Sequence, residues 1–191
     1  LYPNPASVLA FIENQDTDRF LAEGDNLPML KQASTLLLTT RRIPQLYYGT
    51  EVMMNGVKSK SDGYVRKDFP GGWTGDATNA LTPAGRTKIQ NECYDFYKTI
   101  LNWRKGNDVI AKGSMVQFMV QNGVYAYARQ YEGKTVFVML NGTDAETTVP
   151  LKFYKEILKD SKQGKDILSG KAITFGEELK MGPRESLVIE L

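Results

Sequence analysis

The spacing of the apolar residues changes once along this chain of 191 residues, near Gly113. Before that glycine, apolar residues recur at the three- and four-residue spacing of helices, and beyond it they alternate with polar residues as in strands. A pattern with one of these periods does not fold stably as the other, so two kinds of structure should meet near residues 106–113. We therefore expect an α/β part over residues 1–110 and an all-β part over residues 111–191.

The all-β prediction rests on short alternating segments and the glycine turns between them. Asn122-Gly123 separates residues 115–120 from residues 124–129, and Asn-Gly is the strongest short-range signal for a hairpin. Further segments of this kind lie at 135–140, 147–151, 172–175 and 186–191. So many short strands divided by glycine turns predict an antiparallel β-sandwich.

Two helices are predicted in the first part. Residues 27–41 follow Asp25 and Asn26, which are both good N-cap residues, and have Pro28 in the first turn. The second helix should open with Thr82 and Pro83 and run to Lys105, because its apolar residues keep a helical spacing at Ile89, Cys93, Phe96, Ile100 and Trp103.

Two apolar segments of strand length run into polar, acidic loops. The run Val8–Ile12 is expected to be a strand buried on both faces of a parallel sheet, and the loop 13–19 follows it. The segment Arg42–Glu51 is similar and also ends in an acid. In a parallel β/α barrel such strand ends line the active-site mouth, so Asp16 could project into a substrate pocket. The alternative is an Asx-rich turn that only ends the strand.

The two segments resemble signatures of the α-amylase family, glycoside hydrolase family 13. One signature strand of the family ends Phe-x-x-Asn-His-Asp, as Phe11–Asp16 does except at one position, and the next reads Gly-Ile-Pro-x-x-Tyr-Tyr-Gly-x-Glu, similar to Arg42–Glu51. The segment Asp62–Trp73 looks like the eighth loop of the neopullulanase and cyclomaltodextrinase branch, especially the enzymes of Bacteroides starch-utilisation systems. The resemblance implies that residues 1–110 are the last two β/α units of a (β/α)8 TIM barrel and that residues 111–191 are the C-terminal domain.

The same resemblance implies a function. The parent would be a retaining glycoside hydrolase acting on α-1,4 links, with α-1,6 links as a second candidate, in starch oligosaccharides, pullulan or cyclodextrins. Such enzymes use a nucleophilic carboxylate and a carboxylic acid that protonates the leaving oxygen. In this family both lie on strands that precede the signatures seen here, so we expect this chain alone to be inactive.

The resemblance also implies roles for particular residues. Asp16 would be the third carboxylate of the family, which binds sugar hydroxyls and favours the distorted ring. Gln15 occupies the position of the motif's histidine, and its amide can bond a sugar hydroxyl but cannot become charged. Asp62, Arg66 and Trp73 would contact sugars beyond the cleavage point. A solvated salt bridge is the alternative for Asp62 and Arg66, and packing is the alternative for Trp73.

Other interpretations stay open. One is a non-catalytic glucan-binding module, and another is a family member that has lost hydrolysis, suggested by Gln15. Tyr47 and Tyr48 could offer rings to sugars or could pack in the core. Asn14 and Arg19 are expected to brace the loop. In the β part, the tyrosines at 125, 127 and 131 share one strand face, which is either a glucan-binding face or half-buried core.

Composition excludes several classes of site and partner. The 24 Lys and Arg residues nearly balance the 22 Asp and Glu residues, which argues against a nucleic-acid partner. No apolar stretch has the roughly 20 residues of a membrane helix, and residues 1–5 show no signal peptide. The absence of histidine excludes a Ser-His-Asp triad and the usual zinc or iron sites, and Cys93, the single cysteine, is expected to be a buried, inert thiol.

The expected partners are α-glucan oligosaccharides and the rest of the parent barrel. Because two barrel strands would leave open edges, self-association of this chain is also expected. The resemblance suggests a periplasmic or extracellular location, although the residues themselves do not fix one. Family members often hold calcium through loops that lie outside this sequence, so no calcium site is assigned and no other metal site is predicted.

Overall fold

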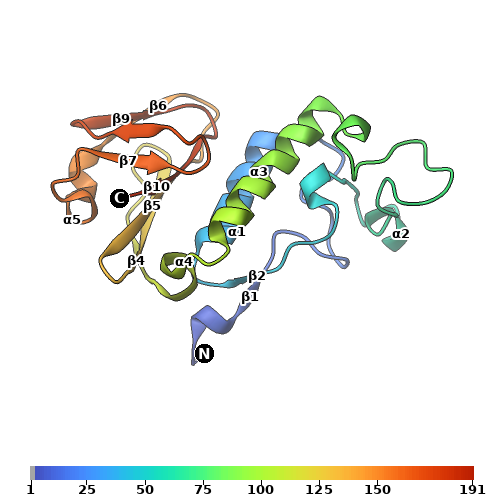
Figure 1. Cartoon of the computed structure of the whole chain (residues 1–191), viewed down its shortest axis with the longest axis horizontal. Helices are drawn as coiled ribbons and strands as arrows, with labels where there is room; N and C mark the ends of the chain where they lie inside the picture. The colour runs from blue at the N-terminus through green and yellow to red at the C-terminus, as the bar shows by residue number, and fades with distance from the viewer. Residues whose placement is uncertain (1–2) are drawn as a thin grey trace. The chain divides into compact units, whose positions relative to one another are not determined.

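The computed structural model describes residues 3–191, and the chain divides into two compact units. The first unit contains the residues up to 37 together with 42–98, and the second contains 38–41 together with 99–191. The helix α3 (Lys88–Arg104) passes from the first unit into the second. Figure 1 shows the elements along the chain.

The first unit contains one pair of parallel strands. β1 (Leu9–Ala10) pairs with β2 (Ile43–Pro44), and α1 (Leu27–Thr39) lies in the connection between them. The other elements of this unit are short: η1 (Pro5–Ser7), η2 (Thr50–Val52), α2 (Asp62–Val65) and η3 (Pro83–Gly85). The long connection between β2 and α3 is thus ordered around short helical turns.

The predicted first strand is shorter and more exposed than expected. Only Leu9 and Ala10 of the run 8–12 form a strand, and the side chains of Leu9 and Phe11 are 51% and 43% exposed. A sheet of two strands has no neighbour at its outer edges and little cover on its faces, so burial on both faces is not reached within this unit.

The helices follow the predicted apolar spacing. α1 buries Leu27, Leu30 and Leu37, and the side chain of Asn26 accepts a hydrogen bond from the Met29 amide at 3.1 Å, as expected for an N-cap. α1 ends at Thr39, two residues before the predicted end.

α3 (Lys88–Arg104) is separated from the predicted start at Thr82 by the 3-10 turn η3. Thr82 caps that turn, since its hydroxyl accepts from the Gly85 amide. Thr87 and Gln90 then form a reciprocal capping box, in which the Gln90 amide donates to the Thr87 hydroxyl at 3.3 Å and the Thr87 amide donates to the Gln90 side chain at 2.9 Å. The sequence Thr-x-x-Gln was the signal for this second start.

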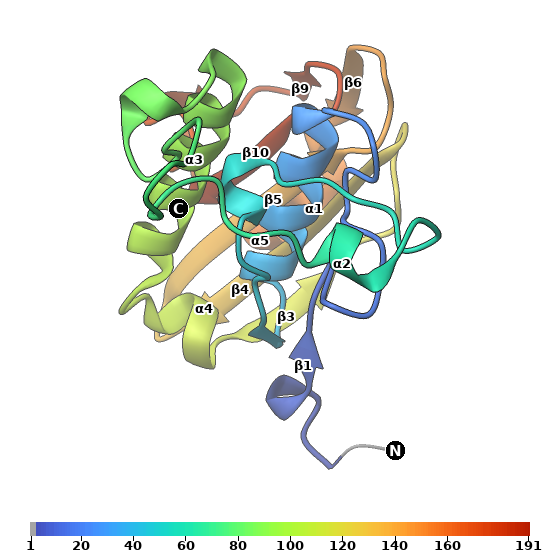
Figure 2. The same ribbon diagram turned by 90° about the vertical axis from the view of Figure 1, so that its right-hand side faces the viewer.

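The second unit is an antiparallel β domain, as predicted. A six-stranded sheet has the order β3-β4-β5-β10-β7-β8, and β6 pairs with β9 in a two-stranded sheet. Figure 2 shows the long β4 and β5 side by side, with α4 near their ends. The bounds are β3 Ser114–Gln117, β4 Val124–Tyr131, β5 Lys134–Asn141, β6 Thr147–Pro150, β7 Gln163–Asp166, β8 Ala172–Thr174, β9 Glu178–Met181 and β10 Ser186–Glu190; the helical pieces are α4 Asp108–Lys112, η4 Leu151–Tyr154 and α5 Lys155–Leu158.

The Asn122-Gly123 turn is confirmed. Both residues have positive φ, 50° and 78°, as a type I′ turn requires, and β3 and β4 pair on either side. β7 and β9 were not predicted, because Gln163-Gly-Lys-Asp and Glu178-Leu-Lys-Met lack a clear apolar alternation.

Alternating side chains of the large sheet form two cores. One face packs against the two-stranded sheet, with Phe137 and Met139 from β5 against Val149 of β6 and Met181 of β9. The other face carries Tyr127, Val138 and Val188, which pack against Val109 and Ile110 of α4. The β domain is therefore a sandwich with a helical cover on its outer face.

A buried arginine of β4 forms hydrogen bonds with α4 and with the segments next to it. Arg129 is 1% exposed, and its guanidinium donates to the carbonyls of Thr39 and Ile110 at 2.8 Å each, to that of Gly113 at 2.8 Å and to that of Ser114 at 3.2 Å. Burial lowers the pKa of Arg129 from its ordinary value. The four carbonyls belong to the end of α1, to the short helix α4 with its C-cap and to the start of β3, where helix carbonyls often need partners from outside the helix.

None of the helices in the described part of the chain is long and apolar enough to cross a membrane.

Replacing Arg129 should unfold the second unit more easily. Arg129→Met keeps the apolar stem but removes the hydrogen bonds of the guanidinium to four carbonyls, so we expect the free energy of unfolding to fall by about 3 kcal/mol. The measurement is urea unfolding followed by circular dichroism. The matched control is Arg184→Met, which removes a surface pair with Asp144 and should cost less than about 1 kcal/mol. Equal losses would contradict the role given to Arg129.

The thiol of Cys93 should be unreactive in the folded chain. Burial raises its pKa to about 12, and its sulfur lies 3.6 Å from the Thr50 carbonyl. Because folding raises this pKa, the protonated thiol contributes to the free energy of unfolding. This contribution is fully present below the ordinary thiol pKa of about 8.5 and is lost as the pH rises through about 12. At pH 8, alkylation by iodoacetamide should therefore be slow until urea unfolds the first unit; rapid alkylation of folded chain would show that Cys93 is accessible.

Candidate functional site

The loop that follows β1 holds the first predicted site residues. Its conformation is fixed locally, because the Asn14 side chain accepts from the Asp16 amide at 2.8 Å and the Thr17 hydroxyl accepts from the Asn14 amide at 3.1 Å. The predicted Asx turn is thus present. It is compatible with a binding role, since the turn leaves the Asp16 side chain 60% exposed.

Four of the five predicted site residues lie in one polar cluster. Arg66 Nη2 lies 3.2 Å from Asp16 Oδ1 and 3.3 Å from Asp62 Oδ2, and Arg66 Nε donates to the Gln15 carbonyl at 3.0 Å. The side-chain amide of Gln15 donates to Asp16 Oδ2 at 2.9 Å. The loop after β1 and the segment around α2, some 50 residues later, are joined through these contacts.

Lys58 completes this cluster. Its Nζ donates to the Asp16 carbonyl at 3.0 Å and lies 3.5 Å from Asp62 Oδ1. Two carboxylates thus face two cations, and the side chains of Asp62 and Arg66 are 55% and 41% exposed. Exposed ion pairs of this kind add little to the stability of the fold, so their main effect is to orient the four charged side chains.

The Asp16 carboxylate retains capacity for a ligand. Each of its oxygens accepts one donor, from Gln15 and from Arg66, while an ionised carboxylate offers about four lone-pair sites. Two sites are therefore open on a carboxylate that faces solvent. Such a group can accept hydrogen bonds from adjacent hydroxyls of a sugar.

Trp73 stands apart from this cluster. Its ring is 72% exposed, and its backbone amide donates to the Asp76 carboxylate at 2.9 Å. Within residues 3–191 it shares no hydrogen bond with Gln15, Asp16, Asp62 or Arg66. With this exposure the alternative of a packing role is not the one observed, while the sugar contact stays a prediction.

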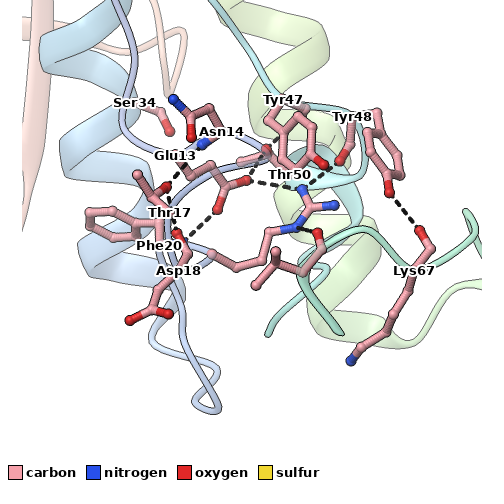
Figure 3. Close-up of polar contacts among 12 residues, drawn as sticks. Glu13, Asn14, Thr17, Asp18, Phe20, Ser34, Tyr47, Tyr48, Thr50 and Lys67 are labelled. Atoms are coloured by element: carbon pink, nitrogen blue, oxygen red, sulfur yellow. Dashed lines mark hydrogen bonds and ion pairs between the residues drawn. The ribbon is translucent and has the colours of Figure 1, made fainter. Parts of the chain in front are cut away.

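A buried ion pair between the two residues that flank the loop 14–18 was not predicted. Glu13 and Arg19 are 2% and 1% exposed, and Arg19 Nη1 lies 3.4 Å from Glu13 Oε1. Glu13 also accepts from the Phe20 amide and from the hydroxyl of Thr50. Figure 3 shows Glu13 and Thr50 pointing toward each other, beneath Tyr47 and Tyr48.

Arg19 joins three segments of the first unit. Its guanidinium donates to the Tyr48 carbonyl at 2.6 Å and to the Val65 carbonyl at 3.0 Å, and its Cζ lies 3.9 Å from the centre of the Tyr47 ring. The backbone amide of Arg19 donates to the Gly56 carbonyl at 2.9 Å. The predicted bracing role of Arg19 is present, and Glu13 is its partner.

The side chains of Tyr47 and Tyr48 pack beside this buried ion pair. Their rings meet edge to face with centroids 4.7 Å apart, and the Tyr48 hydroxyl donates to the Lys67 carbonyl at 2.6 Å (Figure 3). Burial is the main cause that raises the pKa of Tyr47. Gly49 follows with φ of 80°, a conformation that only glycine adopts without strain, so the chain can turn directly after the Tyr48 carbonyl.

The three tyrosines of β4 differ from one another. Tyr127 is fully buried, its hydroxyl pairs with that of Thr39, and burial raises its pKa. Tyr125 is partly buried and donates to the Gln117 side chain at 2.6 Å. Tyr127 is therefore core, whereas Tyr131 remains partly exposed.

No group of three or more His, Cys, Asp and Glu side chains with the spacing of a metal site occurs among the described residues.

Comparison with known proteins identifies the family. Residues 115–190 match the family model described as Cyclo-malto-dextrinase C-terminal domain. Over 176 residues the chain is 30% identical to an α-amylase of Niallia circulans, covering 88% of this chain and 29% of that protein. It is also 30% identical over 170 residues to a cyclomaltodextrin glucanotransferase of Bacillus sp. (strain 6.6.3), covering 84% of this chain and 21% of that protein. The chain belongs to the α-amylase family.

Solved structures agree on the fold. The α-amylase of Geobacillus thermoleovorans, solved with acarbose, has a TM-score of 0.76 at 22% identity and covers 99% of this chain and 40% of its own. An Anoxybacillus α-amylase gives a TM-score of 0.73 at 21% identity, with 99% and 39% covered. This member of the α-amylase family therefore spans less than half the length of the relatives and structures it matches.

Removing the charge of Glu13 should destabilise the first unit. Glu13→Gln leaves the Arg19 guanidinium buried without a counter-charge, and we expect a loss of about 3 kcal/mol in the free energy of unfolding. The matched control is Glu23→Gln, which removes an exposed pair with Lys60 and should cost less than about 1 kcal/mol. Urea unfolding measures both, and hydrogen exchange of the amides of residues 14–18 should be faster in Glu13→Gln alone. Equal stability of the two variants would show that the buried pair does not hold the loop.

Proposed function

We propose that this chain is the C-terminal portion of a retaining glycoside hydrolase that acts on α-1,4-glucans, with α-1,6 links as a second candidate. Starch oligosaccharides, pullulan and cyclodextrins are the proposed substrates. The observation that carries the proposal is the exposed Asp16 carboxylate, oriented by Gln15 and Arg66 in the loop that the buried pair of Glu13 and Arg19 flanks. Support comes from the relatives, which are α-amylases and cyclomaltodextrin glucanotransferases.

The proposed domain division keeps the boundaries expected from the sequence. Residues 1–110 would be the last two β/α units of a TIM barrel, and residues 111–191 the C-terminal β domain. The parallel pair β1 and β2 with α1 between them supports the first part of this proposal. Assignment to the neopullulanase branch rests on the loop 62–73.

In this proposal Asp16 binds sugar hydroxyls at the cleavage point and favours the distorted ring. Gln15 and Arg66 hold the carboxylate in place. Sugars of the glucan beyond the cleavage point are contacted by Arg66, Asp62 and Trp73. Because hydroxyl contacts that strengthen in the transition state lower the barrier, Asp16 acts on kcat as well as on binding. The nucleophile and the general acid would come from the rest of the parent barrel.

Two rival functions are tested by the same experiments. A non-catalytic glucan-binding module is favoured by the exposed Trp73 ring, and a family member without hydrolase activity is favoured by Gln15 at the histidine position. Maltooligosaccharide affinity retained by the isolated chain would favour the binding module. In the upstream sequence of the parent, both catalytic carboxylates would support an enzyme, and their absence would support the inactive family member.

The chain alone should release no reducing sugar from starch, pullulan or cyclodextrin. A retaining site needs two carboxyl groups about 5–5.5 Å apart, one ionised and one protonated, and Asp16 cannot fill both roles. Reducing-sugar assays on the purified chain and on the parent test this. Hydrolysis by the chain that survives Asp16→Asn would overturn the proposed mechanism.

In the parent, Asp16→Asn should lower kcat at least about a hundredfold, because contacts of this kind supply several kcal/mol in the transition state. The matched control is Asp95→Asn on the exposed side of α3, which should leave kcat unchanged. Gln15→His in the parent should raise turnover if the amide is a weaker sugar ligand than an imidazole. A parent in which Asp16→Asn and Asp95→Asn behave alike would remove Asp16 from the site.

A further inference from the structure

A groove of about 620 Å³ lies within the second unit. Its walls are the end of α3 with the loop into α4, the turn between β4 and β5, and the end of β10. Pockets that take small ligands typically measure roughly 300–1,000 Å³, so the groove is large enough for an oligosaccharide segment. None of its residues belongs to the Asp16 cluster.

Two aromatic side chains line the groove. Trp103 and Tyr131 both pack against the outer core of Tyr127, Val136 and Val188, and both remain partly exposed toward the groove. The indole N–H of Trp103 donates to Glu190 Oε1 at 2.7 Å, which fixes the orientation of the ring. Rings that are held from behind lose little conformational entropy when a ligand stacks on them.

The polar lining of the groove is mixed in sign. Its charged residues are Lys105, Asp108, Glu132, Lys134 and Glu190, two cations against three carboxylates. A phosphate or polyanion would meet more negative than positive charge, whereas a neutral ligand with many hydroxyls can donate to the carboxylates and accept from the lysines. The lining therefore suits an uncharged carbohydrate.

We propose that this groove is a second glucan-binding site, built on the β domain from the rings of Trp103 and Tyr131 and the carboxylate of Glu190. The choice of an α-glucan among carbohydrates rests on the proposed function, while the groove itself does not. Such a site holds a glucan strand on the protein without taking part in its cleavage.

The two tryptophans of the chain make the test specific. In Trp73→Phe, Trp103 is the only tryptophan, and its fluorescence should change and saturate as maltohexaose is added. Cellohexaose, with β-links, is the comparison ligand. In the same background Tyr131→Ala should raise the Kd about tenfold, because a stacked ring is lost. Glu190→Gln keeps the shape and should weaken binding severalfold. The matched control Phe153→Ala, at an exposed ring outside the groove, should leave the Kd unchanged.

The outcomes separate this site from the Asp16 cluster. In Trp103→Phe, only Trp73 reports, so a response there without one from Trp103 would support the proposed function and overturn the second site. The reverse result would support the second site and count against a sugar contact at Trp73. Thermal unfolding of each variant shows that it is folded. The inference is wrong if the fluorescence of Trp103 does not change when maltohexaose is added. It is also wrong if Glu190→Gln and Tyr131→Ala are folded and both keep the original Kd.

Discussion

The ion pair of Glu13 and Arg19 is the contact on which the candidate site depends. Removing a charge pair from solvent costs less when its remaining donors and acceptors are also bonded. Here the carboxylate accepts from a backbone amide and a hydroxyl, and the guanidinium donates to two carbonyls and faces a tyrosine ring, while Arg19 Nη2 has no hydrogen-bond partner among the described residues. The loop that carries Asp16 begins and ends at these two residues, so its position follows from theirs.

Arg129 is the corresponding buried arginine of the second unit, and no carboxylate among the described residues forms an ion pair with it. Its fork of donors bonds four carbonyls that lie where elements begin or end. In both units an arginine thus supplies the hydrogen bonds that neither helix nor sheet can give to its own ends. Lysine could not replace either residue, because its three donors on one nitrogen do not span such separated carbonyls.

The sequence predicted what short-range patterns encode. The Asn122-Gly123 hairpin, the long strands β4 and β5 and the cap at Asn26 were all found where expected, because each depends on neighbouring residues. β7 and β9 were missed because their pairing is set by distant strands rather than by an apolar alternation. Likewise the motif drew attention to Gln15 and Asp16, but the partners of Glu13 lie at Arg19 and Thr50, and burial of an acid cannot be read from its own neighbourhood. The roles of Asp16, Gln15, Asp62, Arg66 and Trp73 toward sugars stay predictions.

The position of β10 has a consequence for how this protein is made. Among the six strands of the large sheet β10 comes last in the sequence, yet it lies between β5 and β7 in the middle of that sheet (Figure 1). Until it leaves the ribosome, the edge of β5 is open and the hairpin of β7 and β8 has no sheet to join. The β domain therefore folds only after translation has passed residue 190, and a nascent chain stalled earlier would present an unpaired edge to chaperones and proteases.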